Sequence, residues 1–221
     1  MELISNILSK INNNEHGIER IKYQFNIDIA KKVWHSIALK HIQNLQYDEF
    51  NKKVWPELIK YIFGDETCEY DLMKSVSLIG QTGTGKSKCF EIMQEFISID
   101  EIRYKNNGKL ARFNFKIVSS KTIAGEFSKV GYDAIYKYSN INALCIDDLG
   151  SESDEVKHYG SKVNVIEEII ETRYLNGLFT HFTSNLKPDN ILDMYGNRVY
   201  SRIVHSTNII EYNNCDYRLK K

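Results

Sequence analysis

Apolar residues recur at two different periods along the chain, and the change between them falls near residue 70. Apolar side chains follow helical spacing over residues 27–45, and residues 47–63 repeat that spacing around Pro56. Because proline lacks a backbone N–H, we expect it to kink this second helix or to start a new one. Gly64 and Asp65 then indicate a helix end.

From Lys74 onward, short apolar or alternating runs alternate with stretches of helical spacing. We expect strands over residues 75–80, 112–120, 143–150, 178–185 and 208–213, and helices over residues 86–99, 121–130, 162–177 and 189–205. This alternation favours a mainly parallel sheet covered on both faces. The sequence therefore predicts an α/β fold, with a helical N-terminal segment over residues 1–70 and one α/β domain over residues 71–221.

Composition and charge narrow the class of protein only slightly. The 221 residues are 42% apolar, enough for one sizeable core. Lysines plus arginines and aspartates plus glutamates number 29 each, so the net charge gives no footprint for nucleic acid, although a local basic patch stays open. Four scattered cysteines without metal-ligand spacing argue against zinc and favour a reduced, cytoplasmic protein, with Cys89 and Cys145 in the core. No window is typical of a signal peptide or a membrane span, so no membrane partner is expected.

A glycine-rich loop follows the first predicted strand and precedes a predicted helix. Its sequence, GQTGTGKS, fits the phosphate-loop pattern GxxxxGK[ST]. Glycines let backbone N–H groups approach phosphates closely, and the helix N-terminus adds partial positive charge. Lys86 is predicted to bind the outer phosphates of ATP, and the Ser87 hydroxyl to bind Mg²⁺. The candidate nucleotide-binding residues are Gly80, Gln81, Thr82, Gly83, Thr84, Gly85, Lys86, Ser87 and Lys88.

A second pattern, LCIDDLG, is an apolar strand that ends in two acids. Asp147 is predicted to hold Mg²⁺ through its water shell, and Asp148 to orient or deprotonate the attacking water. Taken alone, Asp148 could equally cap a following helix. The glycine-rich loop in the same domain favours the catalytic interpretation.

Two later stretches carry side chains suited to a γ-phosphate. The strand LFTHFTSN ends in a polar cluster, where the Asn185 carboxamide could distinguish ATP from ADP, although an ordinary strand-to-loop turn explains the cluster equally well. Arg198 and Arg202 lie four apart on one face of a predicted helix. Because arginine's planar fork suits phosphate, one of them could reach the nucleotide of a neighbouring subunit. A solvated or ion-paired helix face is the alternative.

In this order, the phrases LIGQTGTGKS, LCIDDLGSE, TSNL, YGNRVYSRI and DYR resemble the DnaC/IstB branch of AAA+ ATPases, which contains replicative-helicase loaders and ATPase subunits of transposons. The resemblance runs from Leu72 to Arg218. It implies a P-loop NTPase core in which Asn185 is the sensor residue, on a strand between the two motif-bearing strands. It also implies that Arg202, ahead of Arg198, is an arginine finger used in self-assembly.

The resemblance leaves some positions open. Arg173 matches a basic position in this branch, and a helix-end cation favoured by the helix dipole is an equal alternative. A full AAA+ module carries a C-terminal helical lid with a further arginine, whereas we expect no C-terminal lid domain here and only Arg218 as a late candidate. Asp148 stands where a longer glutamate is usual, which predicts slow turnover.

The leading hypothesis is an ATP-binding and ATP-hydrolysing switch that resembles a DnaC-type replicative-helicase loader and is stimulated by a partner. An IstB-like ATPase that acts with a transposase is one alternative. Contact with single-stranded DNA follows from the resemblance, and residues 100–112, around Tyr104, are the basic candidate for it, although a solvated excursion is the favoured interpretation. A nucleotide kinase would share the phosphate loop but usually needs an arginine-rich lid. A non-hydrolysing nucleotide-binding adaptor is the last alternative.

Overall fold

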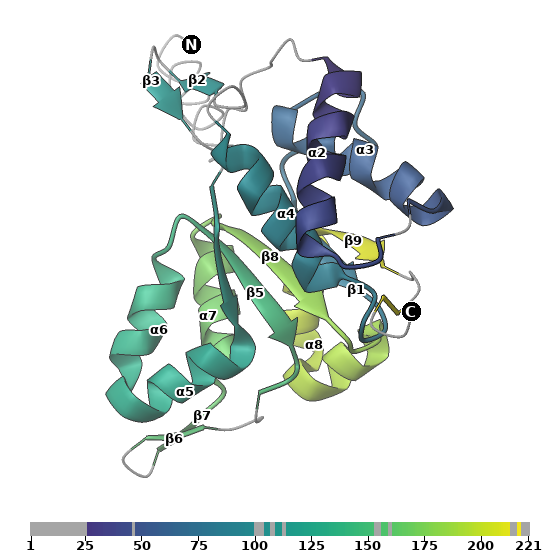
Figure 1. The fold of residues 1–221 in the computed structure, drawn as a ribbon. Helices are drawn as coiled ribbons and strands as arrows, with labels where there is room; N and C mark the ends of the chain where they lie inside the picture. Colours follow the sequence, from purple (N-terminus) through teal and green to yellow (C-terminus); the bar gives the residue numbers. More distant parts are fainter. Residues whose placement is uncertain are drawn as a thin grey trace, which may run out of the picture.

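The computed structural model describes residues 26–45, 47–99, 104–106, 109–111, 114–152, 156–158, 161–212 and 216–217. Labels follow Figure 1. The helices are α2 (Ile27–His41), α3 (Glu49–Phe63), α4 (Lys86–Ser98), α5 (Ser120–Val130), α6 (Tyr132–Ser139), α7 (Val165–Leu175) and α8 (Pro188–Ser206). The strands are β1 (Ser75–Ile79), β2 (Tyr104–Asn106), β3 (Lys109–Ala111), β4 (Lys116–Ser119), β5 (Ala143–Leu149), β6 (Val156–His158), β7 (Ser161–Val163), β8 (Phe179–Ser184) and β9 (Thr207–Glu211).

Five of these strands form one parallel sheet in the order β4-β5-β8-β1-β9. Strand β8 lies between β1 and β5, with Thr183 opposite Leu78 on one side and Phe182 opposite Ile146 on the other. Because the carboxyl ends of parallel strands meet at one edge, the segments that follow β1, β5 and β8 lie together there. The sheet confirms the predicted α/β class and the expected strand between the two motif-bearing strands.

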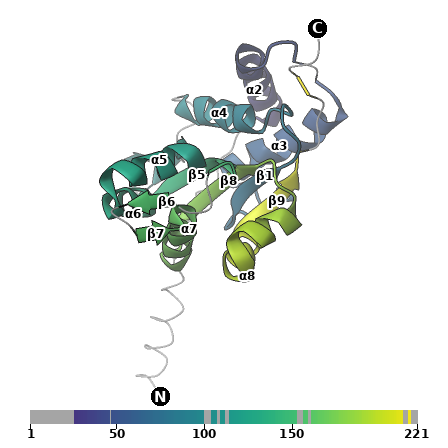
Figure 2. The same cartoon turned by 90° about the horizontal axis from the view of Figure 1, so that it is seen from below.

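Each face of the sheet carries its own layer of helices and its own buried core. One core joins α2, α3 and α4 to the sheet, and the other joins α5, α6, α7 and α8 to it. Figure 2 shows α2, α3 and α4 on one side of the sheet and α7 and α8 on the other. Successive residues of β5 alternate between the cores, since Cys145 belongs to the first and Leu144 and Ile146 to the second. The coverage of both faces agrees with the prediction.

The two helices before the sheet begin and end at residues suited to those positions. The Asn26 side chain accepts hydrogen bonds from the first-turn backbone of α2, and Asp48 does the same for α3. Gly64 ends α3 with a left-handed φ of 67°, as its sequence position predicts. The helix continues through Pro56, so the alternative in which a new helix starts there is wrong. Burial of neighbours such as Trp55 outweighs the one backbone hydrogen bond that the proline removes.

Both tryptophans lie in the core, as expected from their apolar neighbours. Trp34 in α2 packs edge-on against Phe96 of α4, with ring centroids 5.3 Å apart, and Trp55 Nε1 donates to the Tyr212 hydroxyl at 3.3 Å. Helices α2 and α3 therefore share a core with the helix that follows the glycine-rich loop. The domain division at residue 70 remains a prediction, and residues 1–25 lie outside the described residues.

Several elements differ from the expected boundaries. Strand β4 ends at Ser119, one residue before the end of the predicted run, because the Ser119 side chain accepts the Thr122 N–H and starts α5. The eight-residue helix α6 was not predicted. Helix α8 is interrupted at Gly196, whose φ of 74° and ψ of 169° are not helical.

Two antiparallel hairpins project from the sheet, β2 with β3 and β6 with β7. The first hairpin agrees with the predicted excursion over residues 100–112. The side chains of residues 101–113 lie outside the described part of the chain, so a stacking role for Tyr104 stays a prediction. Within the described ranges, no helix combines the length and the apolar character that crossing a bilayer requires.

Candidate functional site

The glycine-rich loop joins the end of β1 to the start of α4. Gly83 and Gly85 have φ values of +84° and +91°, a region that side-chain-bearing residues rarely adopt. A Cβ at Gly83 would lie within about 2.1 Å of the Asp216 carboxylate, and one at Gly85 would lie 3.3 Å from the Tyr217 ring. Gly85 also precedes α4 without a side-chain cap, so the first N–H groups of that helix are left to bind another acceptor.

Lys86 directs its ammonium group back over the loop. The buried Nζ atom donates to the carbonyl oxygens of Gly80 at 2.8 Å and Gln81 at 2.6 Å, and to Asn185 Oδ1 at 2.8 Å. These three acceptors are uncharged, so they satisfy its donors without cancelling its positive charge. The contact with Asn185 joins the loop after β1 to the end of β8.

Ser87 and Asp147 meet at the same edge of the sheet. Ser87 Oγ donates to Asp147 Oδ1 at 2.7 Å, and Thr183 Oγ1 donates to the same carboxylate oxygen at 2.6 Å. The described residues contain no group of three or more His, Cys, Asp or Glu side chains that could hold a metal ion. A hydroxyl beside one carboxylate nevertheless fits Mg²⁺, which prefers oxygen ligands and keeps several of its own waters.

Asp148 stands at an irregular point in the sheet. Its φ is +54°, and the register between β5 and β8 shifts between Ile146 and Leu149. The Asp148 N–H donates to Thr183 Oγ1 at 2.8 Å, and Asn185 Nδ2 donates to Asp148 Oδ1 at 3.3 Å. A left-handed aspartate is uncommon and is maintained only where its surroundings hold it. Asn185 therefore accepts from the lysine ammonium with one side-chain atom and donates to this carboxylate with the other.

A cavity of about 570 Å³ lies over these groups. One part of its lining comes from the glycine-rich loop and from Lys86, Ser87, Asp148 and Asn185. The rest comes from residues 40–43, at the end of α2, and from Tyr217. Reasoning from the sequence missed this second group, because no local pattern indicates that residues so far apart along the chain meet here.

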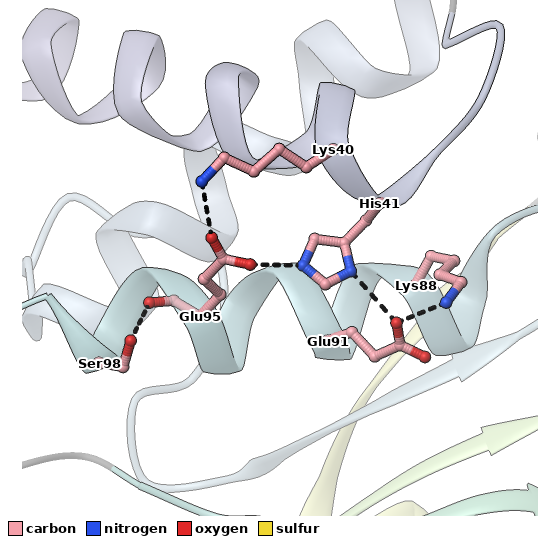
Figure 3. A network of polar contacts seen from close by, with 6 residues as sticks. All are labelled: Lys40, His41, Lys88, Glu91, Glu95 and Ser98. Atoms are coloured by element: carbon pink, nitrogen blue, oxygen red, sulfur yellow. Dashed lines mark hydrogen bonds and ion pairs between the residues drawn. The ribbon is translucent and has the colours of Figure 1, made fainter.

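A network of polar contacts ties α2 to α4 beside this cavity (Figure 3). His41 lies between two carboxylates, with Nδ1 3.2 Å from Glu91 Oε2 and Nε2 2.6 Å from Glu95 Oε2. Lys40 is 3.1 Å from the other oxygen of Glu95. Lys88, a candidate for nucleotide binding, forms an ion pair with Glu91 at 2.6 Å while it lines the cavity.

This network makes a small pH-dependent contribution to stability. The hydrogen bond from His41, followed by that from Lys40, lowers the pKa of Glu95. Because the folded-state pKa lies below the unfolded value of about 4.3, the contribution is full above that pH and is lost as the pH falls through the folded-state pKa. We expect Glu95→Gln to lower the free energy of unfolding by less than about 1 kcal/mol near pH 7, because both partners are partly exposed.

Urea unfolding of both proteins over a pH series measures this difference. It should shrink below pH 4 as Glu95 becomes protonated. Glu49→Gln is the matched control, since Glu49 is paired with Lys52 but is almost fully exposed. A Glu95→Gln effect that stays the same at all pH values would contradict the assignment.

The two arginines of α8 do not reach this cavity within the chain. Arg198 Nε and an Arg202 guanidinium nitrogen each lie 2.7 Å from Glu171 Oε1 on α7, and the Arg202 guanidinium also lies over the Tyr174 ring at 5.4 Å. The Arg202 side chain is 14% exposed, whereas that of Arg198 is 70% exposed. Neither arginine lines the cavity.

Arg173 lies in the last turn of α7, as the helix-end interpretation expects, but it is fully buried. Its guanidinium donates to the carbonyl oxygens of Tyr138, Ile141 and Phe179 and to Thr180 Oγ1, at 2.5–2.9 Å. Burial lowers the pKa of Arg173 to about 10. The residue therefore joins the end of α6 to the start of β8. Arg218, the late candidate, lies outside the described residues.

The fold of this chain has counterparts among solved structures. No family model matches the chain, and no curated protein shows a significant sequence match. Among solved structures, the DnaC helicase loader aligns with a TM-score of 0.54 and 16% identity over 82% of this chain and 98% of its own. The chain has the fold of the DnaC helicase loader. DnaI has the same fold, with a TM-score of 0.55 and 19% identity over 83% of this chain and 93% of its own.

Two further structures share this DnaC-like fold. A primosome component from Streptococcus pyogenes serotype M3 aligns with a TM-score of 0.55 and 19% identity over 87% of this chain and 100% of its own. AMPPCP-bound DnaA from Aquifex aeolicus aligns with a TM-score of 0.50 and 18% identity over 76% of this chain and 48% of its own. These alignments confirm the predicted P-loop fold. Because 87% of the chain exceeds the span from Leu72 to Arg218, the likeness includes part of residues 1–70.

Proposed function

We propose that the chain binds ATP with Mg²⁺, hydrolyses it slowly, and uses this cycle as a switch on a replicative helicase. One observation carries the proposal: the Lys86 ammonium, the Ser87–Asp147 pair, the Asp148 carboxylate and the Asn185 carboxamide all lie at one edge of the sheet, next to one cavity. These groups come from three separate parts of the chain, the start of α4, the end of β5 and the residue after β8, and together they supply what a metal-bound triphosphate requires.

The loop provides the phosphate-binding part of this site. The N–H groups at the start of α4 and the positive end of that helix would bind phosphate oxygens. Lys86 would exchange its contacts with the loop carbonyls for contacts with the outer phosphates. Ser87 and Asp147 would hold Mg²⁺, which when bound neutralises charge that develops on the phosphates.

Hydrolysis would depend on the pair formed by Asp148 and Asn185. The Asp148 carboxylate would accept a proton from the attacking water or orient that water. Asn185 would hold the carboxylate through Nδ2, while its Oδ1 faces the lysine that binds the outer phosphates. Because one side chain contacts both groups, the loss of the γ-phosphate would change the hydrogen bonding of Asp148 as well as that of Lys86.

The helicase-loading role draws its support from the fold shared with the DnaC helicase loader and with a primosome component. ATP as the nucleotide draws support from the AMPPCP-bound DnaA structure. Arg198 and Arg202 would act on the nucleotide of a neighbouring subunit, consistent with their distance from this chain's own cavity. Arg198 is already exposed, whereas Arg202 would have to leave Glu171. Contact with single-stranded DNA is part of this proposal. No observation favours a transposase as partner or a kinase reaction.

We expect Lys86→Ala to weaken binding of ATP with Mg²⁺ by at least roughly 100-fold, because a buried charge-assisted contact to phosphate is worth about 2–3 kcal/mol or more. Isothermal calorimetry measures the affinity. Lys52→Ala is the matched control, since Lys52 is an ion-paired lysine of α3 that does not line the cavity, and it should leave the affinity unchanged.

Mass measurement in solution tests the switch with the same proteins. The unchanged chain, alone or with a replicative helicase, should form a larger assembly with ATP than with ADP, and Lys86→Ala should remove that difference. No binding of millimolar ATP by the unchanged chain, or equal binding by Lys86→Ala, would overturn the proposed function.

A further inference from the structure

The regular pairing of β5 with β8 is interrupted at the point where the two acids lie. It ends with Ile146 opposite Phe182 and resumes with Leu149 opposite Ser184. The two acids between these pairs therefore lie opposite a single residue of β8, Thr183, as in a β-bulge. On the β8 side, the backbone of the bulge needs partners other than the regular ladder, and the threonine side chain supplies one.

The Thr183 hydroxyl contacts both acids. Its oxygen accepts the Asp148 N–H at 2.8 Å, and it donates to Asp147 Oδ1 at 2.6 Å. A hydroxyl has one proton, so donation to Asp147 fixes the direction of this short chain of hydrogen bonds. A carboxylate acceptor polarises the hydroxyl and strengthens the bond behind it. Because Ser87 is proposed to bind Mg²⁺, Thr183 is the donor that can stay on Asp147 throughout.

The bond from the Asp148 N–H helps to hold an unfavourable backbone conformation. Asp148 has a φ of +54°, which a residue with a side chain keeps only where its surroundings impose it. Fully buried Thr183 holds the N–H of this residue, and Ser120 Oγ donates to its carbonyl oxygen at 2.8 Å. With both backbone groups held, the carboxylate is directed to Asn185 and to the cavity.

We propose that Thr183 is a positioning residue for hydrolysis, which holds the Asp148 carboxylate at the cavity and ties it to Asp147. The inference rests on the proposed function, because it assumes that Asp148 acts on the attacking water. Thr183 does not line the cavity, so it acts through Asp148 and not by contact with ATP. One buried hydroxyl thus links the residue expected to hold Mg²⁺ to the residue expected to act on water.

Amide hydrogen exchange tests the backbone contact without any ligand. Thr183→Val keeps nearly the same side-chain shape but has no hydroxyl, so the Asp148 N–H loses its acceptor. We expect this amide to exchange roughly 10-fold faster, which corresponds to the loss of one hydrogen bond. Thr183→Ser keeps the hydroxyl and should retain the protection. NMR of the full chain follows the amide, and equal exchange in Thr183→Val and the unchanged chain would contradict the inference.

Turnover and affinity together test the positioning role. Thr183→Val should lower kcat by roughly 10- to 100-fold, the usual cost of losing a partner that orients a reacting group. Calorimetry should show that its affinity for ATP with Mg²⁺ changes only a few-fold, because the loop still binds the phosphates. Thr183→Ser should restore most of kcat. Thr207→Val is the matched control, since this buried threonine donates to the Ile203 carbonyl oxygen away from the cavity, and it should change neither quantity.

A double variant shows whether Thr183 acts through Asp148. In single-turnover reactions, Thr183→Val should have little further effect once Asp148→Asn is present, because residues that act as a unit are not additive. A further loss as large as that in the unchanged background would place the action of Thr183 elsewhere and overturn the inference. If thermal unfolding shows that Thr183→Val is not folded, Thr183→Ala removes the same hydroxyl and takes its place in each measurement.

The outcomes distinguish this inference from the proposed function. If the unchanged chain binds no ATP, or if Lys86→Ala binds it equally well, the proposed function fails and the inference fails with it. Binding without hydrolysis, even with a partner present, also removes the inference. If the unchanged chain hydrolyses ATP and Thr183→Val is equally fast, only the positioning role is wrong. Weaker ATP binding by Thr183→Val with an unchanged kcat would make the threonine a support for the nucleotide site, which is again contrary to the inference.

Discussion

Asp148→Asn should slow ATP turnover by roughly 100- to 10,000-fold, the range in which a positioned general base contributes, while ATP affinity changes only a few-fold. The substitution keeps the shape of the side chain and the left-handed backbone that it occupies, but it removes the negative charge that accepts or directs a proton. Phosphate release under saturating ATP and Mg²⁺ measures turnover, and calorimetry measures affinity. The comparison is best made with the stimulating partner present, because basal turnover is expected to be slow.

The matched control is Asp133→Asn, which makes the same chemical change at an exposed position in α6. It should leave both turnover and affinity unchanged. Equal turnover by Asp148→Asn and the unchanged chain, with ATP still bound, would assign the base to another residue. If both are inert, the chain is a non-hydrolysing adaptor.

Arg173→Met should lower the free energy of unfolding by roughly 3–5 kcal/mol, which is at the high end for a single substitution. Methionine fills part of the space, but it leaves three backbone carbonyls and the Thr180 hydroxyl without the donor that satisfies them. Each buried polar group left unsatisfied costs about 1–3 kcal/mol. Urea unfolding near neutral pH measures the change.

Two comparisons test whether the buried hydrogen bonds are the cause. Arg198→Met makes the same change at a largely exposed arginine and should cost less than about 1 kcal/mol. Arg173→Lys keeps the charge, but a single ammonium group cannot reach all the acceptors that lie around the edge of the planar guanidinium. The variant should therefore remain clearly destabilised. A value for Arg173→Met as small as that for Arg198→Met would contradict the structural role.

Local pattern was sufficient for most of the fold because burial on one or both faces leaves a period in the sequence. The continuous apolar run at Ile146 and its neighbours and the glycine that ends α3 are both local features. Helix α6 was not predicted because it is only eight residues long and exposes Tyr132 and Tyr136, which weakens its apolar stripe. The expectation that a new helix could start at Pro56 failed for a related reason. The sequence shows the local cost of a proline in a helix, but it does not show the burial that offsets this cost.

Some residues of the candidate site could likewise be predicted from local sequence, and others could not. The glycine-rich loop and the acidic strand end are contiguous motifs, so their residues could be named from the sequence, and the strand order then brought Asn185 to them. The φ of Asp148 depends on a register shift between two strands, and the wall formed by residues 40–43 and Tyr217 depends on packing between distant segments. Arg173 shows the limit most clearly. Its position near a helix end could be predicted from the sequence, but its burial depends on four separate carbonyl and hydroxyl groups.

The contacts of the Lys86 ammonium hold its side chain in place before any ligand binds. Because at least three oxygen atoms already satisfy this cation, it needs no anion to stay in place. An incoming ligand therefore exchanges one set of oxygen partners for another and does not have to order the loop from a disordered state. Preorganisation of this kind reduces the conformational entropy lost on association, and it lets the vacated loop return to the same shape after each cycle.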